Sequence, residues 1–139
     1  MKTRFTSLVK LKKNKVQNSE QFLQKASVNL NSAATALELS NHILKDLESP
    51  KKGTIGEMLA SRVLFHSQMD VINHNKEWVD FAANQVEQAK KQLSVDMMEH
   101  EKFQYLDFEE IKAELKKRKF KEAKDLDEIA LMTYAKKNR

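Results

Sequence analysis

The chain has 139 residues, of which 32% are charged and 40% hydrophobic, with two glycines, one proline and no cysteine. The lack of cysteine excludes a disulfide framework, a thiolate nucleophile and a cysteine-bound zinc site. Residues that tolerate helix better than strand are common, so the composition predicts an all-α, elongated protein. Without a stretch of about 18 apolar residues or an apolar signal-peptide segment, we expect a soluble, cytoplasmic protein.

The net charge of +5 is unevenly distributed along the sequence. Residues 1–15 carry six basic residues and no acid, and residues 110–139 carry ten basic and six acidic residues. Residues 16–109 carry nine basic and fourteen acidic residues. Both ends are therefore basic, and the middle is acidic.

Residues 5–48 have the periodicity of a long helix. Apolar residues alternate three and four apart, which keeps one stripe on one side of a slightly supercoiled helix. In this heptad repeat, positions a and d face a partner helix, e and g flank the contact, and b, c and f point outward. Every a position is aliphatic: Val9, Val16, Leu23, Leu30, Leu37 and Leu44.

The stretch ESPKKGTIGE, residues 48–57, contains the only proline and both glycines. It predicts a turn over about residues 49–56, followed by a second helix over about 57–137 that meets no further breaker. The second helix also has a heptad repeat, with a positions at Met58, Phe65, Ile72, Val79, Val86 and Leu93. Asp96 and His100 interrupt this repeat, which is compatible with a bend near residues 96–101.

Two helices joined by a short connection pack antiparallel, so the chain is expected to form one coiled-coil hairpin. A turn centred between Lys52 and Gly53 places Ala26 opposite Val79 and Ser40 opposite Phe65, each pair combining a small and a large side chain. Beyond about residue 100 the second helix outruns the first. This overhang either folds back as a short third helix or is covered by a partner. An intramolecular hairpin and a domain-swapped dimer both remain open.

The sequence offers little for catalysis. The segment GTIG lacks the lysine of a phosphate-binding loop, and two paired helices have no interior for an active site, so we expect neither an enzyme nor a cofactor. His66, Asp70 and His74 have a spacing that suits metal ligands on successive helical turns. These three residues fall at outward-facing positions, which favours solvated polar side chains over a metal site.

The basic segment KKRKFKEAK, residues 116–124, has three interpretations. It suits nucleic-acid phosphates, a solvated helix face, or docking to an acidic protein surface, and the last is favoured. It lacks the broad apolar face of a membrane-binding helix, so no membrane insertion is expected.

Six apolar residues near the turn fall at outward or flanking heptad positions. Single exposed apolar residues are common on protein surfaces, so these could be unrelated. Their concentration within a few turns slightly favours a protein-binding patch, formed by Leu39, Ile43, Leu59, Val63, Met69 and Val71.

These features together resemble the bacterial flagellar type III export family FliJ and its virulence-system counterparts. The resemblance rests on the basic N-terminus with an early Phe5, the hairpin of about 140 residues, and the lysine-rich C-terminal helix with KDLDEIA at residues 124–130. It implies a noncatalytic, stalk-like export component at the cytoplasmic side of the inner membrane. The end with both termini is expected to enter the export ATPase ring, the turn side to contact the export gate, and the protein to bind and recycle export chaperones.

The resemblance assigns the turn-side patch to the export gate. The residues expected at the ATPase end follow from local charge alone, and they are Lys10, Lys12, Lys13, Lys15, Lys116, Lys117, Arg118 and Lys119. The alternatives are a coiled-coil adaptor unrelated to secretion and a nucleic-acid-binding coiled coil.

Overall fold

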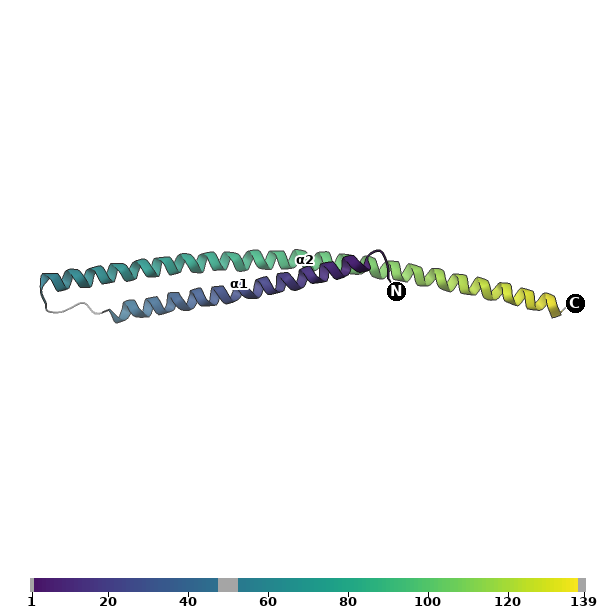
Figure 1. Cartoon of the computed structure of the whole chain (residues 1–139), viewed down its shortest axis with the longest axis horizontal. Coiled ribbons are helices and arrows are strands. Elements are labelled where there is room, and N and C mark those ends of the chain that lie inside the picture. The colour runs from purple at the N-terminus through teal and green to yellow at the C-terminus, as the bar shows by residue number, and fades with distance from the viewer. Residues whose placement is uncertain (1, 48–52, 138–139) are drawn as a thin grey trace. The chain divides into compact units, whose positions relative to one another are not determined.

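A computed structural model describes residues 2–47 and 53–137, which form two long helices (Figure 1). Helix α1 spans Thr6–Asp46 and helix α2 spans Ile55–Lys137. The residues described contain no strand. The predicted all-α helical hairpin is therefore confirmed.

Contacts between the helices divide the chain into two compact units. Unit 1 comprises Met1–Val16 with Asp96–Arg139, and unit 2 comprises Gln17–Val95. Each unit contains part of α1 and part of α2, because both helices continue from one unit into the other.

Helix α2 begins at a threonine cap. The amide of Glu57 donates a hydrogen bond to Thr54 Oγ1 at 3.2 Å, the contact that satisfies a free amide in the first turn of a helix. The cap starts the helix at Ile55, two residues before the predicted Glu57, and places Gly56 in the first turn of the helix. The rest of the predicted turn includes residues 49–52, which lie outside the described residues.

Helix α2 is continuous for 83 residues. It passes through residues 96–101, where Asp96 and His100 interrupt the apolar repeat, without a break in its secondary structure. Residues beyond 100 belong to the same helix, so the described chain contains no separate third helix.

The core of unit 2 is a single seam in which small side chains face large ones. Ala33 on α1 is fully buried at 0% exposure, and Ile72 and Ala82 on α2 are buried as well. Ala26, Val86 and Ala89 form one buried cluster, with Leu23 and Leu30 packed against it. Alanine at these positions lets the two backbones approach closely enough for the aliphatic residues to interlock.

The predicted register of this seam is wrong by one heptad. Ala26 packs with Val86, whereas the predicted partner was Val79, which lies one heptad earlier in α2. The error has a physical cause. Displacement by a whole heptad again sets large residues against small ones, so the apolar pattern alone does not distinguish the two registers. In the observed register, the first ten residues or so of α2 extend past the end of α1.

Polar side chains mark the register that the chain adopts. Gln68 Nε2 donates to the carbonyl of Ser40 at 2.8 Å. Asn75 Nδ2 donates to the carbonyl of Ala36 at 3.2 Å and contacts Ser40 Oγ at 3.1 Å. Ser40 Oγ in turn donates to the carbonyl of Leu37 at 2.8 Å. These polar contacts are partly buried, where an unmade hydrogen bond carries a desolvation cost.

The seam predicts a position-specific response to added volume. Ala33→Leu should lower the free energy of unfolding by about 1–3 kcal/mol, because the seam has no room for three extra carbon atoms at a fully buried site. Ala34→Leu is the matched control, since Ala34 is the exposed neighbour on the same helix. Chemical denaturation followed by circular dichroism measures both variants. Equal unfolding free energies for the two variants would contradict the observed seam.

Candidate partner-binding surfaces

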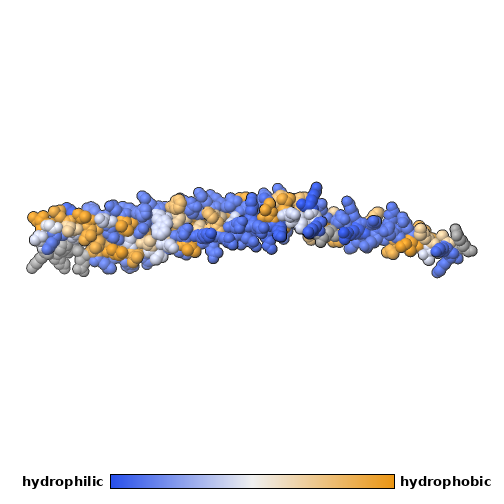
Figure 2. Space-filling model, viewed as in Figure 1, coloured by the Kyte–Doolittle hydropathy of each residue, from blue (hydrophilic) through white to orange (hydrophobic). Residues whose placement is uncertain are grey.

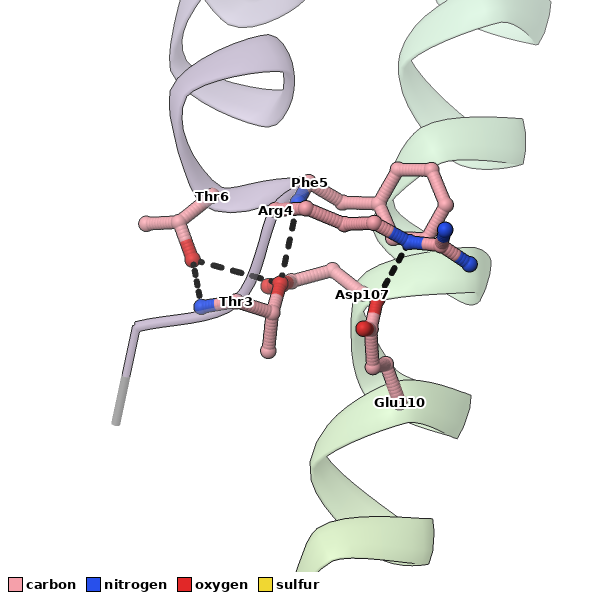
Figure 3. A network of polar contacts seen from close by, with 6 residues as sticks. All are labelled: Thr3, Arg4, Phe5, Thr6, Asp107 and Glu110. Atoms are coloured by element: carbon pink, nitrogen blue, oxygen red, sulfur yellow. Dashed lines mark hydrogen bonds and ion pairs between the residues drawn. The ribbon is translucent and has the colours of Figure 1, made fainter.

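In unit 1, the N-terminal residues contact α2 through a polar network (Figure 3). Arg4 Nε lies 3.3 Å from Glu110 Oε2. The hydroxyl of Thr3 donates to Asp107 Oδ1, and the hydroxyl of Thr6 lies 3.4 Å from the same oxygen. Thr6 Oγ1 also accepts a hydrogen bond from the amide of Thr3 at 2.8 Å. The network thus ties the start of α1 to one turn of α2.

Aromatic and ionic contacts extend this network along α1. The rings of Phe5 and Phe103 lie 6.4 Å apart between centroids, and Lys12 Nζ lies 5.5 Å from the Phe103 centroid and 3.5 Å from Glu99 Oε2. The side chain of Lys12 is only 19% exposed, so this lysine serves a contact within the hairpin. We call the whole set the N-terminal clasp, and it consists of Thr3, Arg4, Phe5, Thr6, Lys12, Glu99, Phe103, Asp107 and Glu110.

The other basic residues expected at the ATPase end are open to solvent. Lys10, Lys13 and Lys15 are exposed on α1, and residues 116–119 are exposed on α2. The run from Lys116 to Lys119 forms no ion pair with any residue that the structure describes. Unit 1 as a whole has 17 lysine and arginine residues against 11 acidic ones.

Residues 112–137 form a stretch of α2 in which every residue is exposed. Its last turns are apolar on several sides, because successive helical residues are rotated by about 100°. Leu131 is 69% exposed and Tyr134 is 68% exposed, and no charge stands between Glu128 and Lys136. We call residues 126–134 the apolar terminus of α2, whose large apolar side chains are Leu126, Ile129, Leu131, Met132 and Tyr134.

In unit 2, hydrophobic surface gathers where α1 ends and α2 begins (Figure 2). The six apolar residues predicted as one patch separate into groups on different sides. Leu39, Ile43 and Val71 fall at c and g positions on one flank of the seam. Met69 is half-buried at an e position, on the opposite flank.

Leu59 and Val63 lie in the first turns of α2, beyond the last turn of α1. They are exposed and belong to a stretch that also borders a groove of about 780 Å³. We call this groove the α2-start groove, and its apolar lining residues are Leu47, Ile55, Met58, Leu59, Ala60, Leu64 and Phe65.

The flank that holds Leu39, Ile43 and Val71 contains apolar residues that the sequence interpretation missed. Trp78 and Phe81 are exposed and line a shallow pocket with His74 and Glu77. Leu64, Val71 and Trp78 repeat every seven residues at g, so the heptad repeat itself carries the signal that indicates this face. We call this set the apolar flank: Leu39, Ile43, Leu64, Val71, Trp78 and Phe81.

The residues with metal-ligand spacing do not form a metal site in the part of the chain that the structure describes. His66, Asp70 and His74 are all exposed on α2. Within residues 2–47 and 53–137, no group of three or more such side chains is arranged to hold a metal ion. Over the same residues, no helix is both long and apolar enough to cross a membrane.

Comparison with known proteins identifies a family for this chain. None of the curated proteins and none of the solved structures that were compared matches this sequence. A family model described as "Flagellar FliJ protein" matches residues 1–139. Because that match includes every residue of the sequence, the chain belongs to the FliJ family of flagellar export proteins.

Proposed function

We propose that this flagellar export component is noncatalytic and couples the export ATPase ring to the export gate at the inner membrane. The observation that carries the proposal is the apolar terminus of α2, a bare helix with large apolar side chains on several sides. A helix that is apolar on all sides is normally buried on all sides. A socket that surrounds the helix, such as the centre of a ring, would cover this surface, whereas a flat surface would cover only one face.

The exposed basic residues of unit 1 also support this unit as the part of the chain that binds the ATPase. The exposed basic residues 116–119 precede the apolar terminus along α2, and the N-terminal part of unit 1 adds Lys10, Lys13 and Lys15. Unpaired lysines and arginines attract an acidic surface and speed its association with unit 1. In this proposal the apolar terminus supplies most of the affinity, and the basic residues supply steering and orientation.

If the apolar terminus binds the ATPase, substitutions there should strongly lower the affinity without changing the stability of the hairpin. Leu131→Ser combined with Met132→Ser should weaken binding to the export ATPase about 100-fold, because two apolar side chains lose their burial. The unfolding transition should not change, since both residues are exposed in the hairpin. Isothermal titration calorimetry with the purified ATPase measures the affinity.

The control for this experiment is Leu39→Ser, an exposed leucine of unit 2 whose substitution should leave ATPase affinity unchanged. Unaltered binding by the Leu131/Met132 variant would contradict insertion of the apolar terminus. Failure of the unaltered chain to bind the ATPase would overturn the proposed function as a whole.

The apolar flank of unit 2 is the surface that we propose for the export gate. It extends across both helices, since Leu39 and Ile43 come from α1 and the remaining four residues from α2. Tryptophan is among the residue types that most often dominate the binding energy of protein interfaces, and phenylalanine is also enriched there. Trp78 is the only tryptophan of the chain, and the α2-start groove lies next along α2.

The gate interaction predicts a difference between two faces of the same unit. Phe81→Ser, at an exposed site of the apolar flank, should weaken binding to the cytoplasmic domain of the gate at least about tenfold. Val28→Ser is the control, because Val28 is an exposed apolar residue at an outward f position of α1. Surface plasmon resonance with the immobilised gate domain compares the two variants. Equal losses would mean that the apolar flank is not the specific contact.

Binding and recycling of export chaperones form part of the same proposal. Their support is the family membership and the resemblance described above, and we assign no residues to this role.

A further inference from the structure

The seam of unit 2 packs almost equally well in two registers. In the observed register Ala26 faces Val86, and Ser40 hydrogen-bonds with Gln68 and Asn75. A displacement of one heptad would set Ala26 against Val79, again small against large. The same holds along the repeat, because the a positions of α1 are aliphatic and those of α2 are all large and apolar. Side-chain volume therefore discriminates weakly between the two registers.

The two registers differ in what they leave uncovered. The observed register leaves Met58 and Phe65 exposed, although both occupy a positions of α2. In the displaced register, Met58 would face Leu47 and Phe65 would face Ser40, so the seam would cover both. Against this gain, Asn75 would lose its contacts with Ala36 and Ser40.

The N-terminal clasp distinguishes the registers, because its contacts do not repeat every seven residues. Arg4 meets Glu110, and Phe5 meets Phe103. After displacement by one heptad, Arg4 would face Phe103 in place of an acid, and Phe5 would face the acid Asp96. The clasp thus fits only the observed register.

We propose that the hairpin has two registers one heptad apart, and that the N-terminal clasp holds it in the observed one. A partner that binds unit 1 and replaces the contacts of the clasp with its own would let α1 slide along α2. The displacement would be about 10 Å, the length of seven helical residues. Because both helices continue through both units, the slide would reach Ala26 and would cover the exposed a positions at the start of α2.

The slide gives the hairpin a means to carry a signal between its two binding ends. Binding at the clasp would alter the α2-start groove, where Met58 and Phe65 line the surface. This use as a signal rests on the proposed function, whereas the existence of two registers is a property of the isolated chain.

Cysteine cross-linking tests the registers directly, because the natural chain has no cysteine. Ala26→Cys with Val86→Cys reports the observed register, and Ala26→Cys with Val79→Cys reports the displaced one. A disulfide needs short separation of the two residues, so a displacement of about 10 Å prevents it. In the otherwise unaltered chain, the first pair should oxidise readily and the second pair only slightly.

Breaking the clasp should move the population toward the displaced register. With Phe103→Ala and Asp107→Ala added, the disulfide yield of the 26/79 pair should rise about tenfold, as expected when a few contacts are removed from a two-state equilibrium. Tyr105→Ala with Glu109→Ala is the matched control, because both residues are exposed on the same turns of α2. The control should leave both disulfide yields unchanged.

An unchanged 26/79 yield in a clasp variant that keeps its helical circular dichroism would overturn the two-register proposal. If that double variant loses helix, Arg4→Gln removes only the exposed ion pair, and a rise of about twofold is then the deciding result. Adding the export ATPase to the unaltered chain should also raise the 26/79 yield. ATPase binding without this rise would overturn the signalling role and leave ATPase binding itself intact, so the two failures are distinguishable.

Discussion

The fold depends on the packing of small residues of one helix against large residues of the other. Ala26, Ala33, Ala82 and Ala89 are nearly without exposure and lie along one seam. In the described residues no third element covers either helix, so this seam supplies most of the apolar burial. The same arrangement leaves the outward faces of both helices free, which is how a chain with almost no interior presents several large surfaces.

The distribution of these surfaces gives each unit a different chemistry. Unit 1 combines exposed basic residues with the apolar terminus of α2, whereas unit 2 presents the apolar flank and the α2-start groove. The clasp belongs to unit 1, where the side chain of Lys12, one of the lysines predicted at the ATPase end, contacts Glu99 and Phe103. Lysines with the same charge thus differ in exposure, because Lys12 packs within the hairpin whereas Lys10, Lys13 and Lys15 are exposed.

Much of the fold follows from local rules in the sequence. The heptad repeats and the concentration of Pro50, Gly53 and Gly56 were enough to predict two helices. The predicted start of α2 at Glu57 was two residues late, although Thr54 stands three residues before Glu57 as in a capping box. The register could not be predicted, because a periodic seam again sets small residues against large ones after a shift of one heptad.

The clasp could be predicted only if the register was known, whereas the apolar flank could be predicted without it. The clasp joins residues about a hundred positions apart in sequence, so no local pattern could place Arg4 beside Glu110. The apolar flank lies on one side of each repeat. The six residues of the predicted patch were chosen by distance from the turn and not by helical face, so they lie on more than one side of the hairpin.

Residues 112–137 are exposed in the isolated chain, and in the proposed function they become enclosed when the export ATPase binds. Hydrogen–deuterium exchange measured with and without the ATPase tests it most directly, because backbone amides in an unpacked helix open far more readily than those in the seam. We expect fast exchange over residues 112–137 in the free chain, slow exchange over the seam of unit 2, and strong protection of residues 126–134 in the complex. Fast exchange of residues 126–134 in a complex that has demonstrably formed would contradict it.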